Sequence, residues 1–176
     1  MRMDHIAYRV ANRYETSRFF KNAMGYKIAT EFNIDFEDSS CAKCIVLEPP
    51  EKVKGMPFRH VFLDSWDMHM APEIFVSDGS PDSIVGKWVK DRDNVGGIHH
   101  IAYQVFSVQE TMDEWKAKGY AEFTTDGPLK CPGLTQCFTK PSELTGVIYE
   151  FIERCSGSHG FCKDNVKDLM ESTEGL

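Results

Sequence analysis

A six-residue repeat constrains the fold of this chain more than any other feature of its sequence. The segment His5-Ile6-Ala7-Tyr8-Arg9-Val10 recurs as His100-Ile101-Ala102-Tyr103-Gln104-Val105, with a difference at one of the six positions. Each copy is followed by an amphipathic stretch that ends at a Gly-Tyr pair, Gly25-Tyr26 in the first copy and Gly119-Tyr120 in the second. Glycine in this place is typical of a helix C-cap. The repeat therefore predicts two copies of one supersecondary unit.

The segments after each helix are rich in β-branched and aromatic residues and are separated by Gly and Pro, which predicts strands. These segments are 27–32, 42–47, 58–64 and 73–76 in the first copy, and 121–124, 134–139 and 147–152 in the second. The unit is thus βαβββ, and the fold class is α+β, with a cup-shaped mixed sheet. We expect a first module at 1–80, a connecting helix at 81–95, a second module at 96–154 and a C-terminal lid helix within 155–176.

The composition favours a small molecule as the partner. The chain has 20 Lys+Arg against 27 Asp+Glu, a net charge of -7, which argues against a nucleic-acid or anionic membrane surface. No apolar run approaches the roughly 18 residues of a membrane helix, and the N-terminal segment lacks the apolar core of a signal peptide. We therefore expect a cytoplasmic protein with free cysteine thiols.

Side-chain alternation on the repeated strands predicts a cavity that contains histidine. The apolar residues of each hexapeptide share one face, which we expect to pack under the helix. His5 and Arg9 in the first copy, and His100 and Gln104 in the second, then face a cavity in which a ligand can bind. Arg9 and Gln104 are candidate contacts for a substrate carboxylate. By the same alternation, His99 faces away from His100 and is a weaker candidate ligand.

Two glutamates in the last strands of the modules complete a candidate metal site. Glu150 stands inside an apolar strand, where a charge is costly unless it is paired or bound to a metal. Glu73 is its expected counterpart in the first module. Imidazole and carboxylate ligands suit Fe(II), Zn, Ni, Co or Mn. A single strand histidine is more often a packed core residue, and His60 is either such a residue or a cavity acid/base.

At this point the sequence resembles the vicinal oxygen chelate superfamily, whose members pair βαβββ modules around one divalent metal. Segments 134–141 and 149–154, together with Gly160-Phe161 and Asn165, are similar to the catalytic half of the 4-hydroxyphenylpyruvate dioxygenases. That resemblance implies an iron held by His5, His100 and Glu150 and a terminal helix that closes over the site. It also implies a substrate pocket lined by the residues at three matching positions, Gln136, Phe138 and Phe161.

Segments 82–88 and 97–100 are instead similar to the methylmalonyl-CoA epimerases. In that family, and in glyoxalase I, a fourth protein ligand comes from the position of Glu73. The sequence departs from both families, because His60 replaces a clear catalytic Glu near 57–64, while an acidic Glu73 is not expected in the dioxygenases.

The number of protein ligands separates the possible functions. Two His and one carboxylate leave three positions of an octahedral metal open, enough for a bidentate 2-oxo acid and O₂. A fourth ligand at Glu73 leaves two, enough for Lewis-acid stabilisation of an enolate. We expect an Fe(II) dioxygenase that acts on a small 2-oxo acid or a related oxygen-chelating substrate. The alternatives are an O₂-independent isomerase or lyase with Zn, Co or Ni, and a metal-free binding or resistance protein. A homodimer is compatible with all three.

Overall fold

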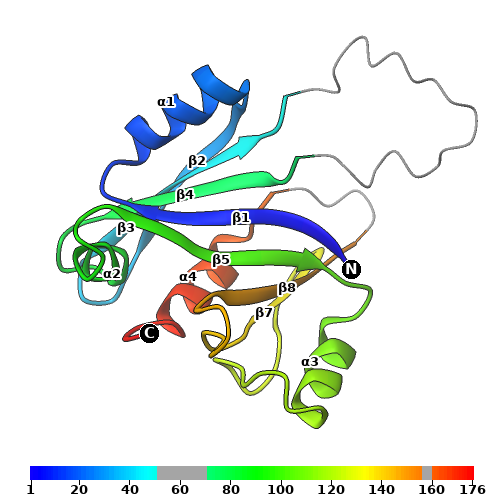
Figure 1. The fold of residues 1–176 in the computed structure, drawn as a ribbon. Coiled ribbons are helices and arrows are strands. Elements are labelled where there is room, and N and C mark those ends of the chain that lie inside the picture. The colour runs from blue at the N-terminus through cyan, green and yellow to red at the C-terminus, as the bar shows by residue number, and fades with distance from the viewer. Residues whose placement is uncertain (51–70, 156–159) are drawn as a thin grey trace, which may run out of the picture.

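A computed structural model describes residues 1–50, 71–155 and 160–176 of the chain, which form a strongly curved sheet with four helices (Figure 1). This mixed α+β architecture confirms the predicted fold class. The expected strand at 58–64, and His60 within it, lie outside the described residues. No helix in the described ranges is long and apolar enough to cross a membrane.

The two halves of the chain repeat the same order of elements. The first half consists of β1 (Arg2–Val10), α1 (Arg13–Met24), β2 (Lys27–Asp35), β3 (Cys41–Glu48) and β4 (Glu73–Gly79). Helix α2 (Ile84–Lys90) leads to the second half, which consists of β5 (Gly96–Gln104), α3 (Val108–Ala117), β6 (Leu129–Cys131), β7 (Leu134–Phe138) and β8 (Ile148–Arg154). Helix α4 (Lys163–Glu171) follows.

The second strand of the second unit begins later than the sequence predicts. Segment 121–124 contributes only an isolated bridge between Phe123 and Thr139, and β6 starts at Leu129. A turn at Gly127 and Pro128 separates the two, and proline has no amide hydrogen to donate to a strand ladder. The βαβββ order of the unit is retained.

The repeated hexapeptides lie side by side at the centre of the sheet. The strand order is β2-β3-β4-β1-β5-β8-β7-β6, and the strands of each half stay together. Strands β1 and β5 are antiparallel neighbours, while each is parallel to the last strand of its own half, β4 or β8. This arrangement brings two segments that are 95 residues apart in sequence, around His5 and His100, into contact (Figure 1).

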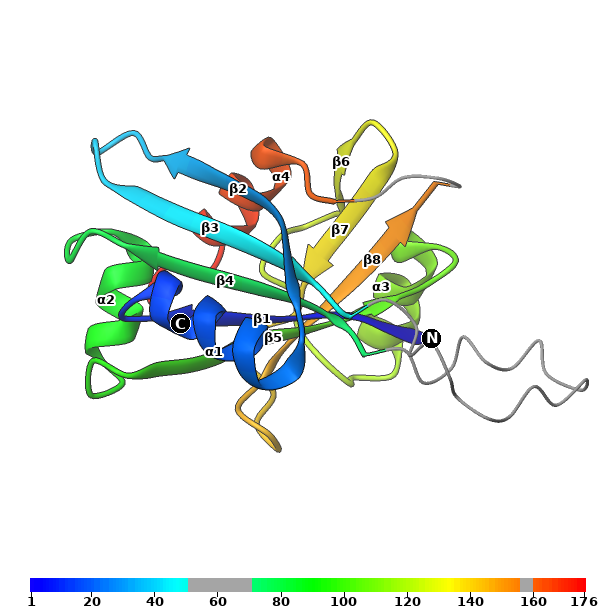
Figure 2. The same ribbon diagram turned by 90° about the horizontal axis from the view of Figure 1, so that it is seen from above.

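The two faces of the sheet have different partners, as the alternation predicts. Val10, Ile6 and Tyr8 of β1 pack with Phe20 of α1 on the outer face. Ala7 of the same strand packs on the inner face with residues of α2 and α4, and α1 and α4 lie on opposite sides of the sheet (Figure 2). Helices α2 and α4 therefore both pack against the inner face.

Helix α1 ends where the sequence predicts. The Asn12 side chain accepts hydrogen bonds from the amides of Tyr14 and Glu15 at 3.0 and 3.2 Å. Gly25 ends the helix with φ of 77°, a left-handed conformation that glycine adopts without a steric penalty. The C-cap predicted at Gly25 is confirmed.

Candidate metal centre

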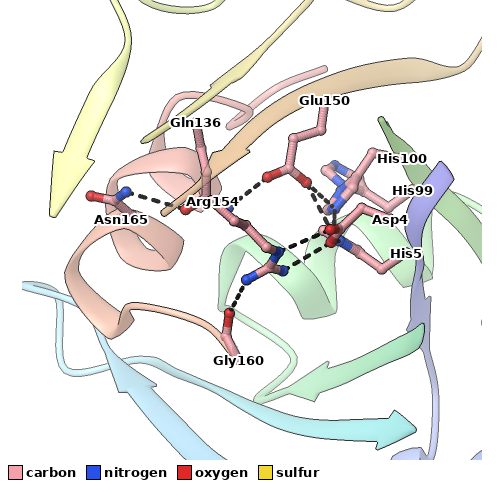
Figure 3. A network of polar contacts seen from close by, with 9 residues as sticks. All are labelled: Asp4, His5, His99, His100, Gln136, Glu150, Arg154, Gly160 and Asn165. Atoms are coloured by element: carbon pink, nitrogen blue, oxygen red, sulfur yellow. Dashed lines mark hydrogen bonds and ion pairs between the residues drawn. The ribbon is translucent and has the colours of Figure 1, made fainter. Parts of the chain in front are cut away.

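Three side chains from the central strands and β8 converge on the inner face (Figure 3). His5 Nε2 lies 3.1 Å from Glu150 Oε2, and His100 Nε2 lies 3.2 Å from the same oxygen. The two Nε2 atoms are 3.2 Å apart. All three residues are buried. The structure thus brings together the three residues that the sequence singled out as ligands.

The spacing of these atoms fits a bound divalent cation. With bonds of about 2.1 Å, neighbouring ligand atoms are about 3.0 Å apart in an octahedral site and about 3.4 Å apart in a tetrahedral one. The observed edges of 3.1–3.2 Å lie in that interval, so the three atoms can occupy one face of a coordination shell. One carboxylate and two imidazoles are ligands that Fe(II), Zn and related ions accept.

The atom of His5 that faces away from the cluster has a partner of its own. His5 Nδ1 lies 2.9 Å from Asp4 Oδ1, and the carboxylate of Asp4 accepts hydrogen bonds of 2.9 and 2.8 Å from Nε and Nη2 of Arg154. Arg154 also donates to the carbonyl of Gly160 at 2.7 Å (Figure 3). Asp4 therefore holds the His5 ring with Nε2 toward the cluster, as outer partners of metal ligands commonly do.

The free oxygen of Glu150 is held in the same way. Gln136 Nε2 donates to Glu150 Oε1 at 2.6 Å, and Asn165 Nδ2 donates to Gln136 Oε1 at 3.1 Å (Figure 3). Because Asn165 lies in α4, this chain of bonds links the terminal helix to the cluster. The sequence drew attention to Asn165 only as part of a matching segment and assigned it no role.

His99 is the residue whose orientation the alternation mispredicts. The register pairs Ala7 with His100 and Tyr8 with Ile98, so His99 is an extra residue on β5, as in a β-bulge. Both histidines are buried on the inner face, and the two Nδ1 atoms lie 2.8 Å apart. His99 therefore supports the His100 ring as Asp4 supports His5. The sequence carried one signal for it, the adjacent histidine pair after Gly96-Gly97.

The register also corrects the expected counterpart of Glu150. Glu150 lies opposite Ala102 on β5, and the equivalent residue of the first module, Ala7, lies opposite Phe75. Glu73 is two residues earlier, opposite His5, and it does not belong to the three-residue cluster found among the described residues. The Phe75 ring packs 6.5 Å from the His5 ring. An apolar side chain thus occupies the place where a symmetric fourth ligand would stand.

Charge pairing dominates the titration of the cluster. Burial alone would lower the pKa of His5, but Glu150 and Asp4 raise it to about 9. Burial alone would raise the pKa of Glu150, but His5 and His100 lower it to about 2. For His100, burial outweighs the effect of Glu150, and its pKa is lowered. The metal-free cluster thus holds a carboxylate beside one imidazolium, and a divalent cation can take the place of that proton.

A cavity adjoins the cluster. Four of the predicted substrate contacts line it: Arg9, Gln136, Phe138 and Phe161. Gln104 does not line it. This residue ends β5 opposite Arg2, whose Nη2 donates to Gln104 Oε1 at 2.8 Å in an exposed position. His60 lies outside the described residues.

Paired βαβββ units around a buried His/His/Glu cluster define a glyoxalase-like class of proteins, whose members typically bind a divalent metal. The sequence agrees, because residues 4–138 match the Glyoxalase/Bleomycin resistance protein/Dioxygenase superfamily. The chain belongs to this superfamily, also called vicinal oxygen chelate, and the resemblance found in the sequence is confirmed. No curated protein sequence matches the chain.

Solved structures with the same fold include proteins of different activity. A mutant of 4-hydroxymandelate synthase from Streptomyces coelicolor superposes with a TM-score of 0.76 at 16% identity, covering 98% of this chain and 53% of that one. This chain therefore spans about half the length of the synthase. A methylmalonyl-CoA epimerase superposes with a TM-score of 0.65 at 20% identity, covering 89% of this chain and 97% of that one. A hypothetical protein from Bacillus halodurans C-125 has a TM-score of 0.64 at 24% identity, with coverages of 90% and 98%.

Proposed function

We propose that this protein is a mononuclear Fe(II) dioxygenase that acts on a small 2-oxo acid. The observation that carries the proposal is that Phe75, rather than an acid, occupies the position equivalent to Glu150. Three protein ligands leave three positions of an octahedral metal for a bidentate 2-oxo acid and O₂. We also propose that the protein is cytoplasmic and that its partner is a small molecule.

Iron would supply O₂ activation and Lewis-acid polarisation of the 2-oxo acid at His5, His100 and Glu150. Gln136 keeps Glu150 turned so that one oxygen faces the metal position while the other accepts a hydrogen bond of 2.6 Å. Asp4 and His99 orient the two imidazoles through their Nδ1 atoms. These partners fix the three ligand atoms before any metal or substrate binds, and such preorganisation favours tight binding.

Aromatic rings exclude water around the cluster. Phe161 lies edge-on to His5 with centroids 4.9 Å apart, and Phe138 lies 4.6 Å from His100. Residues of α4 continue the apolar wall of the cavity, and Leu169 and Met170 are among those that line it. The cluster is thus enclosed on the side where the apolar part of a substrate would pack, and Phe138 and Phe161 are the proposed contacts.

Oxygen uptake after anaerobic reconstitution with Fe(II) tests the proposal. We expect O₂ consumption that depends on both iron and a 2-oxo acid, with release of CO₂ from the acid. Aryl and alkyl 2-oxo acids should both be assayed, because both aromatic and aliphatic side chains line the cavity. Absence of O₂ consumption with every 2-oxo acid would overturn the proposal.

Variants at the two glutamates separate the dioxygenase from the alternatives. Glu150→Ala should abolish iron binding and O₂ uptake, whereas Glu73→Gln should retain both. Loss of bound metal in Glu73→Gln would instead support an O₂-independent isomerase or lyase with four protein ligands and Zn, Co or Ni. If His5→Ala leaves the affinity for a ligand unchanged, the metal-free binding protein is the better description.

A further inference from the structure

Arg9 is a buried cation without a carboxylate partner among the described residues. It lies on β1 with 2% of its surface exposed, and its Nη2 donates to Thr173 Oγ1 at 3.0 Å. Nη1 is buried and has no hydrogen-bond partner in the part of the chain that the structure describes. A buried cation is costly unless an anion or several acceptors surround it. A neutral hydroxyl on one nitrogen leaves most of that cost uncompensated.

The surroundings of Arg9 add positive charge rather than negative charge. Its guanidinium lies 5.8 Å from the Trp88 ring, and the guanidinium of Arg92 lies 3.7 Å from the same ring. Burial and the charge of Arg92 lower the pKa of Arg9 to about 9, so Arg9 is still a cation at neutral pH. Arg9 also lines the cavity beside the cluster, together with Ser77. An anion that enters the cavity would therefore meet an unneutralised guanidinium.

His99 offers a second polar atom at the same place. Its ring lies 5.5 Å from Trp88 and lines the cavity, and its Nε2 is buried without a described partner. His99 Nδ1 lies 2.8 Å from His100 Nδ1, so Nε2 is the ring nitrogen of His99 that is left for a ligand. Arg9 Nη1 and His99 Nε2 are therefore two buried nitrogens without a described partner, on residues that line the same cavity.

We propose that Arg9 and His99 form a subsite for a carboxylate at the far end of the substrate, so that the substrate is a 2-oxo acid with a second carboxylate. The inference rests on the proposed function only for the 2-oxo acid end of the substrate, which would face the metal. His5 and Arg9 are four residues apart on one strand face, a Cα span of about 13 Å. Between them stands Ala7, whose small side chain leaves room for a short chain.

Matched ligands test the subsite by calorimetry on the Zn(II)-loaded protein, because Zn(II) is redox-inactive and does not activate O₂. The probes are 2-oxoglutarate and 2-oxopentanoate, which have the same chain length and differ by the second carboxylate. We expect 2-oxoglutarate to bind about 10- to 100-fold more tightly, as a charge-assisted pair predicts. Arg9→Gln should remove this preference and Arg9→Lys should retain part of it. Arg18→Gln, which removes an exposed arginine of α1 on the outer face, is the control and should leave the preference unchanged. Equal affinities in the wild type, or a preference that persists in Arg9→Gln, would overturn the inference.

Thermal shifts with glutarate and with phosphate test the Arg9 subsite independently of the metal chemistry. Glutarate lacks the 2-oxo group, and we expect it to raise the melting temperature of the wild type but not of Arg9→Gln, whether or not metal is bound. This outcome stands even if no O₂ uptake is found, so the two proposals fail independently. If inorganic phosphate produces the Arg9-dependent shift and glutarate does not, the carboxylate assignment is wrong. Arg9→Gln should itself keep or raise the melting temperature, because it removes an uncompensated buried charge, and a marked decrease would indicate a structural role instead.

Discussion

Phe75 and Glu150 occupy equivalent positions in the two modules of this protein. Each lies on the last strand of its module, opposite the alanine that stands two residues after the cluster histidine. One contributes an apolar ring to the inner core and the other a carboxylate to the buried cluster. The repeat is therefore symmetric in its backbone and asymmetric in its chemistry, and this asymmetry limits the cluster to three of the described residues.

Phe75→Glu should add a fourth ligand at a cost in stability. A carboxylate in this apolar cluster should destabilise the metal-free protein by on the order of 3 kcal/mol. Metal should restore more stability to this variant than to the wild type, while O₂ uptake should fall because one open position is lost. Thermal melts with and without metal measure the first effect. Phe75→Gln is the control: it should lose a similar amount of stability, but metal should restore no more stability to it than to the wild type. Equal recovery in the two variants would contradict the equivalence.

Gln136→Met should weaken metal binding without removing a ligand. It breaks the 2.6 Å bond to Glu150 Oε1 and the bond from Asn165, so the carboxylate loses its fixed orientation. We expect metal affinity to fall by about 10- to 100-fold, the usual effect of removing such a partner. Gln104→Met, the same change at an exposed site outside the cavity, is the matched control for a competition assay with a chelator. Equal affinities for the two variants would argue against an orienting role.

Asp4→Asn should act on the other side of the cluster. The change removes the charge that His5 Nδ1 and Arg154 share, so the His5 ring is held less firmly and its basicity falls. A loss of metal affinity of about tenfold or more is expected. Asp78→Asn breaks a comparable bond of 2.8 Å to Arg13 away from the cavity and controls for the loss of an ion pair. A similar metal affinity in the two variants would show that Asp4 is only structural.

The metal-free protein should lose stability as the pH rises above 6.5. The pKa of His5 is raised from 6.5 to about 9, so its contribution is complete below 6.5 and disappears as the pH rises through 9. The pKa of Glu150 is lowered from 4.5 to about 2, so its contribution is present above 4.5 and is lost as the pH falls through 2. Melting temperatures of the wild type should decline between pH 6.5 and 9. His5→Gln should flatten that decline, and an unchanged slope would contradict the assignment.

The repeat in the sequence predicted most of the fold and most of the residues of the cluster. A hexapeptide that recurs before two similar helices predicts paired modules, and its alternation places His5 and His100 on one face. Glu150 was recognisable because an acid inside an apolar strand needs a partner. These inferences succeed because alternation and burial are local properties that a strand carries wherever it pairs.

Tertiary structure decided which neighbours surround that cluster. The sequence aligned Glu73 with Glu150, but the hydrogen-bonded register of β4 against β1 places Phe75 there. The irregularity in β5 turned His99 inward, against the alternation. Register and bulges are set by pairing between strands far apart in the chain, so a single sequence determines the residues of the cluster, while only the folded sheet determines their number and their partners.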